Sequence, residues 1–193
     1  MAASMLLNEM HIMTSVYRKY GDWDKVKKHI FENRLLQTRT EATAVRYFRE
    51  LRFRIDGLND TQMDLIINGS IEEQKQIIWW SICKKYQFIK EFAIEIIHSK
   101  FLLHDYNVSH IDYIRFFESK SDYDPSLLDL TDSTRKKQEQ VIFRMLREAS
   151  ILDKEHRIVP ASLSINVVEA LKQDKPDSFL VFPITETQLR GYL

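Results

Sequence analysis

The sequence contains little cysteine, glycine or proline, and each scarcity excludes a class of structure. The single cysteine, Cys83, excludes an intramolecular disulfide and is typical of a protein from the reducing cytoplasm. It lies in the most apolar part of the chain without a base nearby in the sequence, so we expect an inert core thiol. Four glycines and four prolines are too few for the tight turns of a β-sandwich or barrel, and no Gly-rich phosphate loop is present. The composition therefore favours a mainly α-helical protein.

An excess of charge and long apolar runs are also missing. The chain has 28 Lys and Arg against 28 Asp and Glu, so any surface for nucleic acid or an anionic membrane must be local. The longest uninterrupted apolar runs, Ile77 to Trp80 among them, are far shorter than the ~20 residues of a membrane-spanning helix. The N-terminus lacks the pattern of a signal peptide. We therefore expect a soluble, cytoplasmic protein with no membrane contact.

The sequence shows none of the local motifs of catalytic and metal sites. The six histidines have neither HExxH nor CxxC context, and their closest gathering, His104 and His110 beside Asp105, is better explained by a polar loop. No pair of carboxylates is placed by its spacing in an apolar setting suited to acid–base catalysis. We therefore predict a protein that is not an enzyme and that uses no metal or cofactor. A nuclease or other enzyme whose site is assembled from distant residues is the least supported alternative.

The richest apolar stretch, residues 71–103, is expected to form the core. Its isoleucines and aromatic residues recur with a helical period from Ile78 onward, which predicts helix rather than strand. Trp79 and Trp80 are flanked by isoleucines and not by basic residues, so they fit a core better than a platform for stacking nucleic-acid bases. Helices from both sides of the sequence are expected to cover this stretch.

Arginines mark one face of an expected helix in the N-terminal third. Helical patterns over residues 5–20 and 22–36 are separated by Gly21, and a third helix is expected from Thr40 to about Leu58. A helix, a short turn and a second helix led by arginines form the outline of a helix-turn-helix, although helical hairpins with a solvated arginine face are common. The candidate DNA-contacting residues here are Arg39, Arg46 and Arg49.

A helix expected over residues 131–152 separates apolar from basic side chains most clearly. Thr131 or Asp132 can cap it. Its apolar side consists of Val141, Ile142, Met145, Leu146 and Ala149. The opposite sector holds Lys136, Lys137, Gln140, Arg144 and Arg147, with Arg135 at the first turn. Such a row of cations could neutralise DNA phosphates and release their counterions, but a solvated helix surface explains the pattern about as well.

The C-terminal part is expected to contain a small two-stranded β element. Ile158 and Val159 form one β-rich run and residues 179–182 another, with a helix over residues 163–171 between them. A recognition-type helix followed by small strands is the outline of a winged helix. We expect a helical domain over residues 1–108 and a winged-helix-like domain over residues 109–193, with a soft boundary that would also allow one packed unit.

Three segments together resemble the BrxA family of BREX (bacteriophage exclusion) defence systems. They are WWSICKKYQFIKEFAIEII at residues 79–97, the arginine-bearing segment at residues 35–58, and STRKKQEQVIFRMLREASIL at residues 133–152. The resemblance implies a small, mostly helical, cytoplasmic protein that binds double-stranded DNA without catalytic activity, with helix-turn-helix or winged-helix elements and a likeness to the NusB-type helical fold. It implies partners in the system's methyltransferase, ATPase and phosphatase-like component. Gln87 stands where the family pattern suggests proline, so a helix break there is less certain.

Two functional hypotheses follow. The first is a DNA-binding accessory protein in which Lys136, Lys137, Arg144 and Arg147 contact phosphates and Gln140 reads a base edge. The second is an adaptor whose basic faces dock acidic surfaces of partner subunits and whose DNA affinity is incidental. Exposed basic side chains free of acidic partners would favour the first hypothesis, and burial of Arg144 or Arg147 in ion pairs would argue against it.

Overall fold

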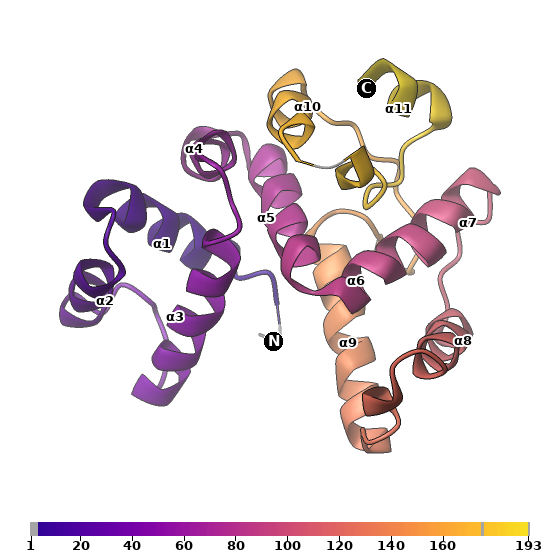
Figure 1. Ribbon diagram of the computed structural model, residues 1–193, viewed down its shortest axis with the longest axis horizontal. Helices are drawn as coiled ribbons and strands as arrows, with labels where there is room; N and C mark the ends of the chain where they lie inside the picture. The colour runs from indigo at the N-terminus through magenta and orange to yellow at the C-terminus, as the bar shows by residue number, and fades with distance from the viewer. Residues whose placement is uncertain (1–3, 175, 193) are drawn as a thin grey trace. The chain divides into compact units, whose positions relative to one another are not determined.

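The computed structural model describes residues 4–174 and 176–192 and shows a mainly α-helical protein (Figure 1). Its contacts divide the chain into two compact units. The first comprises Met1–Lys85 and Leu163–Gln173, and the second comprises Tyr86–Ser162 and Asp174–Leu193. The expected division into residues 1–108 and 109–193 stays a prediction.

Local capping signals explain where the helices of the first unit begin and end. The helices are α1 Leu7–Tyr20, α2 Trp23–Glu32, α3 Glu41–Ile55, α4 Asp60–Asn68, α5 Ile71–Lys85 and α10 Ile165–Lys172. Gly21 ends α1 in the left-handed conformation, with φ +62°, as expected from its position. The Asp22 side chain accepts a hydrogen bond from the backbone N–H of Lys25 and caps α2. Two helices end earlier than expected, α2 at Glu32 and α3 at Ile55.

The core of the first unit includes the tryptophans of α5, as the sequence predicts. Trp79, Trp80 and Cys83 are all buried. Although α10 is distant in sequence, it packs against α4 and α5, and the side-chain amide of Gln62 donates to the carbonyl of Ala170 at 3.0 Å. A short segment from the C-terminal part of the chain therefore completes the core of the first unit.

A break at Tyr86 divides the central apolar stretch, which the sequence pattern carries through as helix. Tyr86 is extended, with φ −122° and ψ 91°, and a new helix, α6 Gln87–Phe92, follows it. That helix continues into the π-helical segment η1 Ala93–His98 and then α7 Ser99–Leu102. No proline accompanies this break. The first residue of α6 is Gln87.

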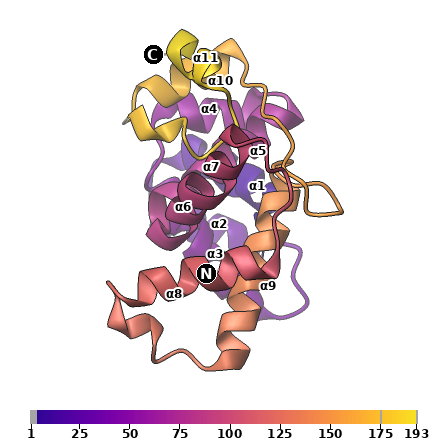
Figure 2. The ribbon, with the colours of Figure 1, turned by 90° about the vertical axis from the view of Figure 1, so that its right-hand side faces the viewer.

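An aromatic core holds the second unit together. Its further helices are α8 His110–Ser121, α9 Asp132–Glu148 and α11 Glu186–Tyr192, with 3-10 turns η2 Pro125–Leu127 and η3 Pro176–Ser178. Phe92 packs against Phe116 of α8 and Phe143 of α9, with ring centroids 5.2 and 6.3 Å apart. Figure 2 shows α8 crossing beside α9. The aromatic contacts therefore fix α9 to its own unit.

The expected two-stranded β element is wrong. The described residues form no strand, and their only β pairing consists of two isolated antiparallel bridges, Asn107 with Arg157 and Leu152 with Ile158. The run over residues 179–182 instead folds into turns, in which the N–H of Phe182 bonds the carbonyl of Phe179. Hydrogen bonds within local turns thus satisfy the backbone of this buried apolar segment, so it needs no second strand as a partner.

The C-terminal helix α11 was not expected from the sequence. The backbone N–H of Gln188 donates to the Thr185 hydroxyl, and the Gln188 side chain accepts from the Thr185 N–H at 2.9 Å. This reciprocal capping box has the spacing Thr-x-x-Gln, so a local signal for the helix was present. Among the described residues, no helix is both long and apolar enough to cross a membrane.

Candidate nucleic-acid interface

Helix α9 has one buried face and one basic face, as its pattern predicts. The Thr131 hydroxyl caps the helix by accepting from the backbone N–H of Thr134. Ile142, Met145 and Leu146 are fully buried and anchor the helix in the second unit. The backbone of α9 is therefore held firmly, while its opposite face is left to solvent.

The basic face forms one straight row. Lys136, Gln140, Arg144 and Arg147 follow helical spacing and are exposed, and exposed Lys137 lies beside the first of them. With a rise of 1.5 Å per residue, the row is about 16 Å long. Within the part of the chain that the structure describes, Lys136, Lys137, Gln140 and Arg144 make no hydrogen bond or ion pair. The positive charges of Lys136, Lys137 and Arg144 therefore have no acidic partner among the described residues.

Arg135 does not join this row. Its guanidinium donates to the carbonyl of Leu130 at 3.2 Å and lies over the ring of Phe117 at 4.9 Å. The residue is half-buried and ties the first turn of α9 to the chain that precedes it. The nearby Tyr113 hydroxyl donates to the carbonyl of Arg135, and burial raises the pKa of Tyr113, so it stays a neutral donor.

A tight loop follows α9 and closes one end of the basic face. The Asp153 carboxylate accepts from the backbone N–H groups of Arg157 and Glu155 and from the Arg157 guanidinium. These bonds, the Arg157 N–H first, lower the pKa of Asp153 and keep the carboxylate ionised. The rigid turn presents His156, whose Nε2 accepts a hydrogen bond from Arg147 at 2.9 Å. Arg147 thus remains exposed and bonds an imidazole nitrogen, not an acid.

A hollow of about 530 Å³ opens between α9, the start of α8 and this loop. Gln140, Arg144 and Arg147 line it from α9, and His110 and His156 line it from the other two elements. Its one acidic side chain, Glu139, accepts from His110 Nδ1 at 2.6 Å. Sequence reasoning placed neither histidine beside α9, because no spacing pattern joins residues 46 positions apart.

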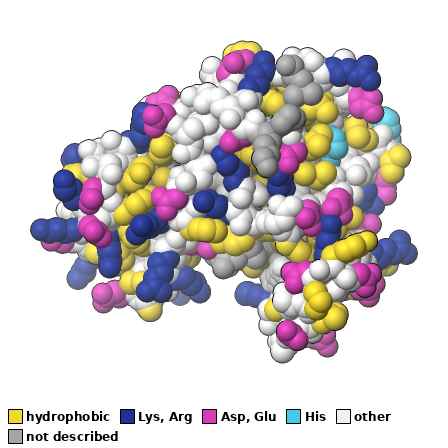
Figure 3. Space-filling view, viewed as in Figure 1, with side chains coloured by type: hydrophobic (Ala, Val, Ile, Leu, Met, Phe, Trp, Pro, Cys, Tyr) yellow, Lys and Arg dark blue, Asp and Glu magenta, His cyan; other side chains and the backbone are white. Residues whose placement is uncertain are grey.

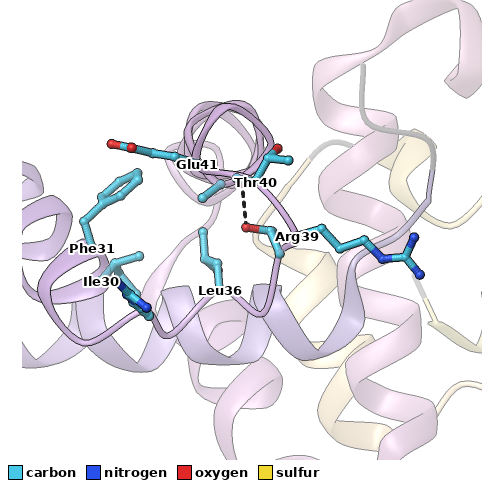
Figure 4. A pocket seen from close by; sticks show the side chains of 9 residues that line it. Ile30, Phe31, Leu36, Arg39, Thr40 and Glu41 are labelled. Carbon is cyan, nitrogen blue, oxygen red and sulfur yellow. Dashed lines mark hydrogen bonds between the residues drawn. The ribbon is translucent and has the colours of Figure 1, made fainter.

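The second predicted basic surface is divided. Arg46 and Arg49 lie exposed on α3 beside a hollow that Phe53 also lines. Figure 3 shows Lys and Arg side chains where α2 and α3 reach the surface of the first unit. Arg39 belongs to the loop before α3 and extends away from Ile30 and Leu36 across a different pocket (Figure 4). The Thr38 hydroxyl, which donates to the Thr40 carbonyl at 3.1 Å, shapes this loop. The structure therefore does not gather these arginines into one row.

The described residues hold no group of three or more His, Cys, Asp or Glu side chains placed to bind a metal ion. The acidic residue of the His104–His110 segment, Asp105, instead pairs with Lys100 at 2.5 Å. Lys100 also contacts Asp112, so these carboxylates serve as partners of a lysine.

Comparisons with known proteins agree with this architecture. The sequence model of the BrxA family matches residues 1–175. The chain is similar to "BREX protein BrxA" of Bacillus cereus (strain H3081.97), with 28% identity over 172 residues covering 87% of this chain and 86% of the relative. It is 22% identical to "BREX protein BrxA" of Escherichia coli O9:H4 (strain HS) over 153 residues, covering 79% and 72%. A crystal structure of an uncharacterized protein from Magnetospirillum magneticum superposes with a TM-score of 0.80 at 18% identity, covering 93% of each chain, which shows a shared fold.

Proposed function

This chain belongs to the BrxA family, and we propose that it is a non-enzymatic protein that binds double-stranded DNA within a bacterial BREX phage-defence system. The family resemblance expected from the sequence is thereby confirmed. Its working place is the cytoplasm, and its further partners are other BREX proteins, including the methyltransferase, the ATPase and the phosphatase-like component.

The observation that carries this proposal is the exposed basic row on α9, whose cations form no ion pair with an acidic side chain among the described residues. A major groove about 12 Å wide admits one α-helix, and cations along that helix reach the phosphates on either side. Lys136, Lys137, Arg144 and Arg147 are the phosphate contacts of the proposal. Gln140 lies between them and has the amide geometry that pairs with an adenine edge.

The surroundings of α9 support the same use. In a helix-turn-helix, one helix crosses the backbone and the next enters the groove, an order that α8 and α9 would follow. The loop over residues 153–157, closed by the bridge between Leu152 and Ile158, would occupy the place of a wing. This winged-helix reading is part of the proposal, since the wing contains no regular strand.

The test is fluorescence anisotropy of a labelled duplex across salt concentrations. Four phosphate contacts predict a slope of log K against log [salt] of about −3.6, which is a loss of about 150-fold over a fourfold increase in salt. The variant combines Lys136→Glu, Lys137→Glu and Arg144→Glu and is checked for folding by circular dichroism. We expect its affinity to collapse and its slope to shrink toward about −1.

A matched control reverses three charges elsewhere. Lys25, Lys27 and Lys28 are exposed on α2, and changing all three to Glu alters the net charge equally. If the control keeps the wild-type salt slope and the α9 variant loses it, the result would support α9 as the DNA-binding surface. Equal loss in both variants would show a general charge effect and contradict the proposal.

The alternative is an adaptor that docks partner subunits. Exposed apolar side chains on α8 favour it, with Ile111 58% and Ile114 37% exposed. No duplex binding at low salt by the wild-type protein, with salt-resistant capture of another BREX protein, would select the adaptor over DNA binding.

A further inference from the structure

Two histidines frame the hollow on the basic face of α9, and neither belongs to the proposed row of DNA contacts. His110 is the first residue of α8, and His156 comes from the loop after α9. Both line the hollow together with Arg144 and Arg147. Histidine is the side chain that ordinarily changes its charge between pH 5 and 8.

His156 is held in one place although it lies near the surface. Its backbone is left-handed, with φ +60°, and its carbonyl accepts from the Val108 N–H at 3.0 Å. Its ring contacts Phe143 with centroids 4.9 Å apart, and Nε2 accepts from Arg147 at 2.9 Å. A side chain fixed in this way loses little entropy when a ligand arrives.

The charges that face the hollow favour an anion. Arg144 and Arg147 each bring a positive charge, while the Glu139 carboxylate is turned to His110. On the loop side, Arg157 pairs with Asp153 at 2.8 Å and lies 3.8 Å from Glu155, so one positive charge is shared by these two carboxylates. In the free protein Arg147 donates to Nε2 of His156, so that nitrogen has no proton to offer to a ligand.

We propose that this hollow seats one backbone phosphate of DNA between Arg144, Arg147 and a protonated His156, so that binding takes up a proton. Solvent supplies the proton to the His156 ring. The nitrogen that accepts from Arg147 in the free protein then donates to a phosphate oxygen, and Arg147 turns to the same phosphate. The inference rests on the proposed DNA binding and adds to it a phosphate site and a direction of pH dependence.

The test measures duplex affinity by anisotropy at about pH 6 and about pH 8, at one constant ionic strength. Uptake of one proton over part of this range predicts wild-type binding about tenfold tighter at the lower pH. The variant is His156→Asn, because asparagine tolerates the left-handed backbone and cannot carry the charge. The matched control is His104→Asn, since exposed His104 also has φ +60° and does not line the hollow.

We expect the wild-type protein and His104→Asn to bind the duplex more tightly at the lower pH. His156→Asn should show no such change and should bind about tenfold more weakly than the wild-type protein near pH 6. In nuclear magnetic resonance spectra, the His156 ring should also titrate at higher pH when duplex is present. Equal pH dependence in His156→Asn and wild type, or salt-sensitive binding without pH dependence, would overturn the phosphate site and leave DNA binding intact. Absence of duplex binding at low salt at both pH values would overturn the proposed function and this site with it.

Discussion

Neutralising Glu50 should destabilise the protein strongly, because this residue is the carboxylate partner of the fully buried Arg54. The Arg54 side chain is 0% exposed and that of Glu50 is 8% exposed. Arg54 donates from Nε to Glu50 Oε1 at 2.9 Å and from Nη1 to the carbonyl of Met5 at 2.9 Å. The pair thereby joins α3, which carries Arg46 and Arg49, to the N-terminal segment.

The magnitude follows from the charge that Glu50→Gln leaves behind. A buried guanidinium without its carboxylate costs about 3–5 kcal/mol of unfolding free energy. For a chain of this size, that corresponds to a fall of about 6–20 °C in the melting temperature. Arg54→Met removes the guanidinium and leaves both the Glu50 charge and the Met5 carbonyl without that donor, so a similar loss is expected. The double variant removes both charges of this pair, and we expect it to be less destabilised than the sum of the two single losses.

Urea unfolding followed by circular dichroism measures all three variants. The control is Glu32→Gln, which removes an exposed i,i+4 partner 3.9 Å from Lys28 and should cost less than about 0.5 kcal/mol. A Glu50→Gln loss no larger than that of Glu32→Gln would refute the reasoning, because it would mean that the Arg54 charge needs no partner. Strictly additive single losses would refute the coupling.

Two further stability changes can be measured in the same way. Gly21→Ala should lower the free energy of unfolding by about 1–2 kcal/mol, because φ at this position is +62°. No atom lies within 4 Å of the added methyl group, so the penalty is conformational and not steric. Gly191→Ala in α11 has the same free space and should be neutral or stabilising. Hydrogen bonds from Ser164 and then from the Ser70 N–H lower the pKa of Glu73 from 4.5 to about 2, so this carboxylate stabilises the fold above about pH 4.5 and the contribution disappears as pH falls toward 2. Solvent screening limits this contribution to about 1 kcal/mol, and Glu73→Gln should flatten the pH dependence of unfolding in that window.

Features encoded within one turn of helix could be predicted from the sequence. The caps Asp22 and Thr131 and the stop at Gly21 depend on side chains within three or four residues of the helix end. The basic row on α9 is equally local, because the two faces of a helix are determined by its own sequence. The sequence therefore predicted the row, though its use for DNA stays a proposal.

Features that depend on distant segments could not be predicted. A Glu and an Arg four residues apart on α3 usually indicate a surface pair, whereas Arg54 is buried and donates to the carbonyl of Met5, 49 residues away in the sequence. The break at Tyr86 has neither glycine nor proline to announce it. The hollow beside α9 likewise needs His110 and His156 from separate elements. Each of these is decided by tertiary packing and not by local propensity.

The absence of net charge connects the two functional hypotheses. With equal numbers of basic and acidic residues, the chain has no net charge to attract DNA from a distance, so under the proposed function its affinity would come from the few contacts of α9. The binding constant of a surface with four such contacts falls by about 150-fold over a fourfold increase in salt concentration. One such surface alone would therefore leave little of the protein bound. A second attachment, to a partner protein already on the same DNA, would raise the effective concentration and restore occupancy. Docking through α8 and phosphate binding through α9 would then be successive requirements of one DNA-bound assembly, and a variant of either surface would reduce occupancy at physiological salt.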